Sequence, residues 1–243
     1  MNWIYSLFIC TISLSATPLS HEMSVKKYFV VWNVGQGQWT SLINPNECWH
    51  YDMGGEFFAW SKINKFCGQK TNRVSLSHWD WDHIGGLRKA SKYLKNLCLN
   101  DAPLGNSKPG KMKLLPAHVC IAGEKKWKWQ PTLNPKAGSN EQSQVFITDG
   151  FLLPGDSTQK EEPQWAKALP KTERIRVLIL GHHGSRTSTS DFLLSRIPKL
   201  KLAVASARWR RYHHPHAQVL ASLQKHKIPI LRTEDWGSLW FEL

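Results

Sequence analysis

The stretch Ser77-His78-Trp79-Asp80-Trp81-Asp82-His83-Ile84-Gly85-Gly86 decides how this chain is interpreted. Four of its residues carry side chains that commonly bind metals: His78, Asp80, Asp82 and His83. A tight turn can direct the first two at one ion and the last two at a second ion. Charged groups this close together are costly to bury unless a cation neutralises them. The stretch therefore predicts a metal site on a turn.

The flanking sequence places this turn between a strand and a helix in a layered domain. Residues 73–77 have the composition of a strand, and residues 86–97 carry apolar or small side chains at helical spacing. Further strands are predicted at 28–32, 39–43, 145–148, 151–153, 176–180, 201–205, 228–232 and 238–241, and further helices at 191–197 and 217–226. Residues 100–144 predict loops, with short strand candidates at 113–115 and 118–121. This order indicates an α/β or layered α+β fold.

Three later groups add candidate ligands. Asp156 follows a predicted hairpin strand, and His182 and His183 follow the predicted strand 176–180. His214 and His216 precede the helix predicted from residue 217, where free backbone N–H groups favour an anion. Asp156 could also be an ordinary turn aspartate, and the last two histidines could serve only to start the helix. Carboxylates and imidazoles both suit Zn²⁺, whereas three aspartate oxygens favour a harder ion such as Mn²⁺.

The composition predicts a folded protein with a polyanionic partner. The 243 residues include 32 Lys and Arg against 18 Asp and Glu, a net charge of +14, and a hydrophobic content of 41% with 13 Trp excludes a disordered chain. In two basic segments, aromatic residues lie between the cations, so that phosphates and unpaired bases could both be bound. A basic run can also be only a solvated face. The candidates for DNA contact are Lys125, Lys126, Trp127, Lys128, Trp129, Arg208, Arg210 and Arg211.

The beginning of the chain predicts export. Residues 3–16 form an apolar run that is too short to span a bilayer but suits the core of a signal peptide, which we expect over residues 1–20. No Lys or Arg precedes this run, and a buried first strand is the alternative. Removal of the segment leaves four cysteines, an even number that favours an oxidising compartment, and proximity suggests the disulfides Cys48–Cys67 and Cys98–Cys120. No later stretch is long and apolar enough to cross a membrane, so a secreted or periplasmic protein is predicted.

Six short motifs stand in an order that resembles one family. They are Val34-Gly35-Gln36-Gly37, Asp52 to Gly55, His78 to Gly86, Gly155-Asp156, Gly181 to Ser185, and His214-Pro215-His216. This set is similar to the signatures of the metallo-β-lactamase superfamily and, within it, to the hydrolase domain of ComEC-type competence proteins. The resemblance covers residues 28–243. An ordered set of six motifs is far more specific than any one of them.

The resemblance implies an α+β fold, a four-layer αββα metallo-β-lactamase sandwich in a single domain over residues 28–243. It also implies a nuclease that holds two divalent metal ions, Mn²⁺ or Zn²⁺, and hydrolyses DNA phosphodiesters with a metal-activated hydroxide. The implied metal ligands are His78, Asp80, Asp82, His83, Asp156, His182 and His183, with Asp156 bridging and at least one of the paired histidines taking part. The implied catalytic residues are Asp82, His83, His183, His214 and His216, and Ser185 is an implied substrate contact.

Asn33, Gln36 and Asp52 are expected to support the ligands from behind. Relatives often carry acids where this chain has Asn33 and Gln38, and the amides keep hydrogen-bonding capacity but lose charge. A full competence channel also has a large transmembrane part, which this chain does not show.

Two alternatives to a nuclease linked to DNA uptake or scavenging remain. One is a hydrolase of a small phosphodiester or ester, which would gain little from the basic segments. The other is a weakly catalytic DNA-binding accessory of competence, supported only by the two amides.

Overall fold

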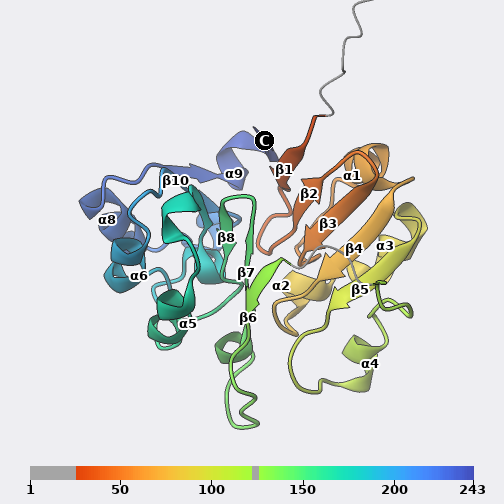
Figure 1. Cartoon of the computed structure of the whole chain (residues 1–243), viewed down its shortest axis with the longest axis horizontal. Coiled ribbons are helices and arrows are strands. Elements are labelled where there is room, and N and C mark those ends of the chain that lie inside the picture. Colours follow the sequence, from red (N-terminus) through yellow and green to blue (C-terminus); the bar gives the residue numbers. More distant parts are fainter. Residues whose placement is uncertain (1–25, 122–125) are drawn as a thin grey trace, which may run out of the picture.

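Two six-stranded β-sheets face each other in the computed structural model, which describes residues 26–121 and 126–243 (Figure 1). The first sheet contains, in spatial order, β12 (Leu239–Glu242), β1 (Tyr28–Val31), β2 (Thr40–Ile43), β3 (Glu47–Tyr51), β4 (Thr71–Ser75) and β5 (Leu97–Asp101). The second contains β11 (Ile230–Arg232), β10 (Leu202–Ala205), β9 (Val177–Ile179), β8 (Phe151–Leu153), β7 (Val145–Thr148) and β6 (Trp127–Trp129). The predicted signal peptide lies outside the described residues.

Each sheet changes from antiparallel to parallel pairing along its width. β3, β4 and β5 are parallel in the first sheet, and β8, β9, β10 and β11 are parallel in the second. The register pairs Tyr51 with Ser75 across β3 and β4, and Leu152 with Leu178 across β8 and β9. Parallel strands end at the same edge of a sheet, and loops at that edge commonly carry functional groups. The loops after β4, β8 and β9 hold all seven candidate ligands, and the loop after β3 holds Asp52.

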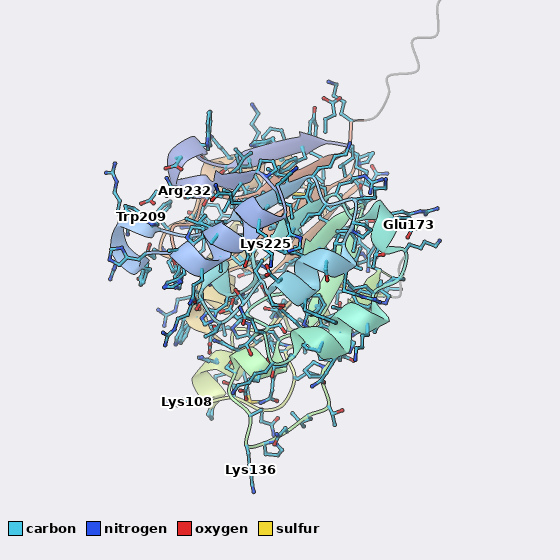
Figure 2. The ribbon with its side chains drawn as sticks, turned by 90° about the vertical axis from the view of Figure 1, so that its left-hand side faces the viewer. Lys108, Lys136, Glu173, Trp209, Lys225 and Arg232 are labelled. Carbon is cyan, nitrogen blue, oxygen red and sulfur yellow. A yellow bond between two sulfur atoms is a disulfide. The ribbon has the colours of Figure 1, made fainter. Side chains whose placement is uncertain are left out.

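Helices cover the outer face of each sheet. α1 (Trp60–Cys67) and α3 (Leu87–Tyr93) pack on the first sheet, and α5 (Glu162–Ala168), α6 (Asp191–Arg196) and α8 (Ala217–Lys225) pack on the second. Figure 2 looks onto this second group, with Lys225 of α8 facing the viewer. An inner apolar layer, which includes Phe29 and Ile179, separates the sheets. These layers confirm the predicted four-layer αββα sandwich in one domain.

Short helices lie in the connections between these layers. They are α2 (Trp81–Ile84), α4 (Pro109–Met112), α7 (Trp209–Tyr212), α9 (Thr233–Trp236), and the 3₁₀ turns Asn140–Gln142, Thr172–Arg174 and Gly181–Gly184. Among the described residues, none of the helices combines the length and apolar character that a membrane span requires.

Several predicted boundaries were wrong. The helix predicted over 86–97 ends at Tyr93, because Leu94 adopts an extended backbone and residues 97–101 form β5 against β4. Residues 113–115 form no strand, and 118–121 contribute only one bridge, from Leu99 to Val119. β3, β6, α1 and α5 were not predicted. α1 lacks a side chain that caps its first turn, so its sequence carries no start signal.

Both predicted disulfides are confirmed. Cys48–Cys67 joins β3 to the end of α1 inside the core of the first sheet. Cys98–Cys120 ties β5 to the segment that bridges it at Val119. The two crosslinks therefore fasten a helix and a loop to the same sheet.

Candidate metal centre

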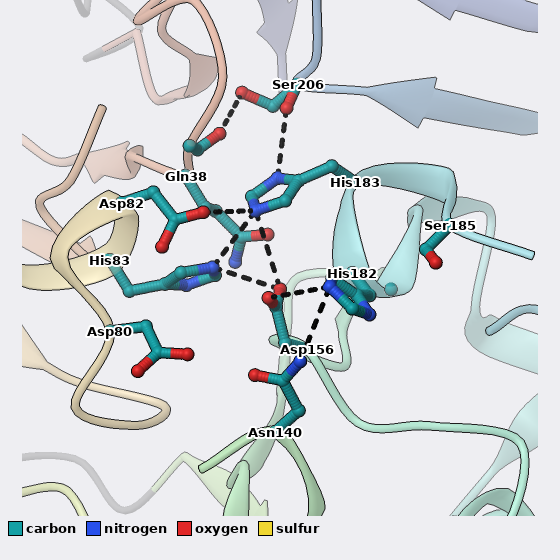
Figure 3. A network of polar contacts seen from close by, with 12 residues as sticks. Gln38, Asp80, Asp82, His83, Asn140, Asp156, His182, His183, Ser185 and Ser206 are labelled. Atoms are coloured by element: carbon teal, nitrogen blue, oxygen red, sulfur yellow. Dashed lines mark hydrogen bonds and ion pairs between the residues drawn. The ribbon is translucent and has the colours of Figure 1, made fainter. Parts of the chain in front are cut away.

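Asp156 lies at the centre of the candidate site, and its two carboxylate oxygens face different histidines (Figure 3). Oδ1 is 2.9 Å from Nε2 of His83 and 3.6 Å from Nε2 of His183. Oδ2 is 3.8 Å from Nε2 of His78 and 3.7 Å from Nε2 of His182. Asp156 thus stands between two pairs of imidazoles, and each pair combines one histidine that follows β4 with one that follows β9.

Each pair of imidazoles is accompanied by a second carboxylate. Oδ2 of Asp82 is 3.2 Å from Nε2 of His183, and the Nε2 atoms of His83 and His183 are 3.2 Å apart. Ligand atoms of Asp82, His83, Asp156 and His183 all lie within 4.8 Å of one another. On the other side, Oδ2 of Asp80 is 3.5 Å from Nε2 of His78.

This donor set fits divalent metal ions. Nε2 of His78 is buried and has no hydrogen-bond partner among the described residues, although it faces two carboxylates. The Nε2 atoms of His83 and His183 point at each other and at carboxylates, as expected of nitrogens that share a cation. Imidazole and carboxylate ligands suit ions such as Zn²⁺ and Mn²⁺.

The central carboxylates are ionised at neutral pH. Burial alone would raise the pKa of Asp82 and of Asp156, but the neighbouring His83 and His183 hold both pKa values below the usual range of an aspartate. Burial would likewise lower the pKa of His83, yet Asp156 and Asp52 raise it well above its ordinary value. Asp82 and Asp156 can therefore bind a metal without first losing a proton.

Asp52 and Ser77 orient the histidines from behind. Oδ2 of Asp52 is 2.7 Å from Nδ1 of His83, and its Oδ1 accepts a hydrogen bond from the Ser77 backbone at 2.7 Å. The Ser77 hydroxyl donates to Oδ2 of Asp52 at 2.8 Å and lies 2.9 Å from Nδ1 of His78. Nε2 of Gln38 also donates to Oδ2 of Asp52, at 3.2 Å. These contacts direct the Nε2 atoms of both histidines toward Asp156.

Strained backbone turns the paired histidines toward Asp156. His182 and His183 have φ values of 45° and 55°, in the left-handed region that only glycine adopts without strain. Nδ1 of His183 donates to the Ser206 carbonyl at 3.1 Å, which leaves its Nε2 free for a metal. His182 is held by the hydroxyl of Thr187, 3.2 Å from its Nδ1, and by Asn140, whose Nδ2 is 3.3 Å from its Nε2.

The sequence of this chain is similar to parts of three known proteins. No protein-family model matches the chain. It is 31% identical over 226 residues to Recombination protein 2 of Haemophilus influenzae and 28% identical over 230 residues to Competence protein ComA of Neisseria gonorrhoeae. These matches cover 85% and 88% of the chain. A shorter match, 30% over 111 residues and 44% of the chain, is to ComE operon protein 3 of Bacillus subtilis.

Two solved structures share the architecture. The metallo-β-lactamase fold protein YhfI from Bacillus subtilis superposes with a TM-score of 0.59 at 13% identity, covering 90% of this chain and 100% of that one. A diphosphatase from the PhnP family gives a TM-score of 0.52 at 12% identity, covering 89% of this chain and 98% of that one.

The chain has the metallo-β-lactamase fold and resembles the ComEC-type competence proteins. It spans only 28%, 32% and 14% of the three curated relatives, so it matches one part of each. The fold, the relatives and the His/Asp cluster together support a metal-dependent hydrolase.

Two glycines of these motifs stand where a side chain would not fit. A Cβ at Gly54 would lie 2.1 Å from the backbone between Asp82 and His83. Gly155 has φ of +57°, and a Cβ there would lie 2.6 Å from Cβ of Ser77. The absence of these side chains lets the loop after β3 and the loop after β8 close onto the metal motif.

The remaining motif residues differ in their relation to the site. Nδ1 of His214 is 3.3 Å from Nε2 of Gln36, beside the candidate ligands. Nδ1 of His216 accepts from the Gln218 backbone at 3.2 Å and so caps α8, the alternative interpretation of this histidine. Oδ1 of Asn33 accepts from the Gly35 backbone at 3.3 Å and closes a local turn, without a contact to any candidate ligand.

Most of the predicted DNA contacts on and next to β6 pack against the core or form ion pairs within the protein. Trp127 and Trp129 are partly buried and pack against the core beneath the helices of the second sheet. Nζ of Lys128 is 2.5 Å from Asp101, and Nζ of Lys126 is 3.7 Å from Asp149. Lys125 lies outside the described residues. A role of this segment in DNA binding stays a prediction, but its two tryptophan rings contribute to the packing of the core.

The second basic segment surrounds one acidic residue. Arg208 and Arg211 lie 3.0 Å and 2.9 Å from the two carboxylate oxygens of Glu56. Arg210 has no ion-pair partner within the described part of the chain. Ser185 is buried beside the paired histidines, with its hydroxyl 3.1 Å from that of Thr187.

Sequence reasoning assigned no role to four residues that position the histidines. They are Ser77, Asn140, Thr187 and Ser206. Ser77 borders the metal motif and Thr187 lies just after the Gly-His-His-Gly-Ser motif, so their positions offered a signal. Asn140 comes from a segment predicted only as loop, and Ser206 acts through its backbone, which no side-chain pattern reveals.

We expect Asp52→Asn to lower metal affinity about 10- to 100-fold while the fold is retained, because the amide cannot accept from Ser77 and His83 together. Competition titration against a chromophoric chelator measures this change. Asp101→Asn is the matched control, since Asp101 also accepts from a serine of the first sheet, Ser75, but contacts no candidate ligand. Equal metal affinity of Asp52→Asn and the unsubstituted protein would contradict the orienting role of Asp52.

Proposed function

We propose that this protein is a nuclease that hydrolyses DNA phosphodiester bonds with two divalent metal ions, Mn²⁺ or Zn²⁺. The observation that carries the proposal is Asp156, whose two oxygens face two separate groups of candidate ligands. One ion would be held by His78, Asp80 and His182, the other by Asp82, His83 and His183, with Asp156 between them. Such a pair of ions supplies an activated water and positive charge for the attacking and leaving oxygens of a phosphodiester.

His214 is the candidate hydrogen-bond donor to the leaving oxygen. Oε1 of Gln36 accepts from the Arg208 backbone at 3.2 Å, so its Nε2 amide faces and donates to Nδ1 of His214. The proton of the neutral imidazole therefore resides on Nε2 of His214. Burial, together with the neighbouring His183 and His182, lowers the pKa of His214 to about 4, so the neutral form prevails in the free protein. This form can donate a hydrogen bond to an oxygen of the substrate.

Two cavities beside the ligands offer room for substrate. One of about 710 Å³ is lined by Asp80 and His182 together with Arg186 and Lys160. Another of about 590 Å³ is lined by His78, Asp80 and Lys111. Asp80 lines both cavities, so each brings cations next to the candidate centre, where they could contact phosphates of a bound strand.

The direct test is incubation of the purified protein with labelled single- and double-stranded DNA plus Mn²⁺, Zn²⁺, Mg²⁺ or EDTA. We expect cleavage with at least one of Mn²⁺ and Zn²⁺ and none with EDTA. Absence of cleavage with all three metals, in protein shown to have bound them, would reject the nuclease.

A hydrolase of a small phosphodiester or ester is the second candidate. The ion pairs of Lys128 with Asp101, and of Arg208 and Arg211 with Glu56, support it, because they reduce the positive charge available to a polyanion. A kcat/KM for bis(p-nitrophenyl) phosphate above that for DNA would favour this candidate.

We also propose that the protein acts outside the cytoplasm, secreted or in the periplasm, in DNA uptake or scavenging. Two disulfides support an oxidising compartment, and the names of the relatives support the link to competence. A fusion of residues 1–20 to a reporter that is active only after export tests the predicted signal peptide.

A further inference from the structure

The two tryptophans of the metal motif have opposite surroundings. Trp79 is 8% exposed, and its indole N–H donates to the carbonyl of Leu104 at 3.0 Å. Trp81, at the start of α2, is 52% exposed, and its indole N–H has no hydrogen-bond partner in the described part of the protein. Core packing therefore explains Trp79 but leaves much of the Trp81 ring open, between the candidate ligands Asp80 and Asp82.

A lysine links the Trp81 ring to the candidate metal centre. Nζ of Lys111, on α4, lies 5.5 Å from the centroid of the Trp81 ring. The same atom donates to the Trp79 carbonyl at 2.5 Å and lies 3.8 Å from Oδ1 of Asp80. The aromatic ring is thus next to the centre, with one ammonium group between them.

The Trp81 ring opens into a basic groove of about 560 Å³. Its lining residues include three cations and no acid: Trp81, Arg88, Ser107, Lys108, Gly110 and Lys111. Arg88 and Lys108 are exposed, and neither forms an ion pair within residues 26–121 or 126–243. The groove shares Ser107 and Lys111 with the cavity that reaches His78 and Asp80, so the two are adjacent.

We propose that this groove binds an unpaired nucleotide next to the reacting phosphate. Trp81 would stack on its base, and Arg88, Lys108 and Lys111 would contact phosphates on the same side of the metal centre. An open aromatic face beside cations, two of them (Arg88 and Lys108) without an ion pair among the described residues, is a combination that binds single-stranded nucleic acids, whereas a duplex keeps its bases stacked inside. The inference rests on the proposed DNA substrate and adds a preference for single strands. An acidic peptide would use the cations but would not require the aromatic face.

The first experiment measures binding without cleavage. Anisotropy of a labelled single-stranded oligonucleotide is recorded in EDTA for the unsubstituted protein, Trp81→Leu and Trp81→Phe. We expect Trp81→Leu to weaken binding about 5- to 150-fold, which corresponds to about 1 to 3 kcal/mol for the loss of one stacked base, and Trp81→Phe to restore most of the affinity. Duplex of the same sequence should lose less than about 2-fold, because it offers no free base face.

Trp236→Leu is the matched control. Trp236 is 70% exposed and belongs to neither basic segment. It ends α9, which leads into β12, whereas α4 of the groove follows β5 at the opposite edge of the same sheet. Trp236→Leu should therefore leave single-strand affinity unchanged.

An abasic oligonucleotide separates stacking from charge. It keeps the phosphates but has no bases, so the Trp81→Leu effect should vanish with it. The double variant Arg88→Gln/Lys108→Gln should instead weaken normal and abasic strands alike and reduce the salt-dependence slope by roughly 1.4, about 0.7 for each lost phosphate contact.

These binding experiments test the stacking subsite independently of DNA cleavage. Equal binding by Trp81→Leu and the unsubstituted protein, or an equal loss for normal and abasic strands, would overturn the stacking subsite even if DNA is cleaved. A loss restricted to strands with bases would support the subsite even if no metal permits cleavage. If poly-glutamate displaces the oligonucleotide and Trp81→Leu changes the affinity for neither ligand, the groove binds acidic peptides and the proposal is rejected.

Discussion

Asp156→Asn is expected to abolish metal-dependent phosphodiester hydrolysis and to remove most metal binding. The amide cannot offer two anionic oxygens to the groups around His83 and His78, which each face one oxygen of Asp156. Loss of a group behind a ligand costs about 10- to 100-fold, so loss of the central carboxylate should exceed this range. Metal content by mass spectrometry and initial rates on labelled DNA measure the two effects.

Asp149→Asn is the control for this substitution. Asp149 stands at the turn between β7 and β8, where it pairs with Lys27 at 2.7 Å, at the opposite end of β8 from Asp156. It should retain full metal content and activity. If Asp156→Asn cleaved DNA as fast as Asp149→Asn, the activity would come from another site or from a contaminant, and the assignment of the centre would have to be abandoned.

The sequence revealed the candidate ligands because each carries a side chain of the appropriate chemistry within a compact motif. It could not reveal how they meet. Asp52, His182 and His183 all adopt positive φ values of 45° to 56°, which their residue types do not suggest. Tertiary contacts impose this conformation, such as the bonds of Asp52 to Ser77 and of His183 to Ser206. Local pattern therefore identified the members of the site but not their relative positions.

The fold was predictable where a strand or helix has a clear period and was missed where long-range pairing determines the structure. The helix was predicted to run to Leu97 and loops were predicted from residue 100, yet residues 97–101 form a strand that pairs in parallel with β4. The same limit applies to Trp127 and Trp129, whose alternation with lysines predicted a binding surface. On β6 this alternation instead directs the tryptophans at the core and Lys128 at Asp101.

The double variant Cys48→Ala/Cys67→Ala is expected to lower the free energy of unfolding by about 3 kcal/mol or more. The crosslink closes a segment with a sequence separation of 19, for which loop-closure entropy in the unfolded chain predicts roughly 3 kcal/mol. Both sulfurs are also fully buried, so their removal leaves a cavity beneath α1 that adds to the loss. Urea denaturation of purified protein measures the difference.

The double variant Cys98→Ala/Cys120→Ala separates the effect of loop closure from the effect of the cavity. Its disulfide has a similar sequence separation of 22, but both cysteines are only partly buried. It should therefore show the loss of loop closure with little cavity cost, and a smaller destabilisation than the first pair. An unchanged free energy of unfolding in both double variants, with four free thiols found by alkylation of the denatured protein, would mean that the disulfides do not form. Because paired cysteines are the main physical support for an oxidising compartment, that result would also remove the basis for placing the protein outside the cytoplasm.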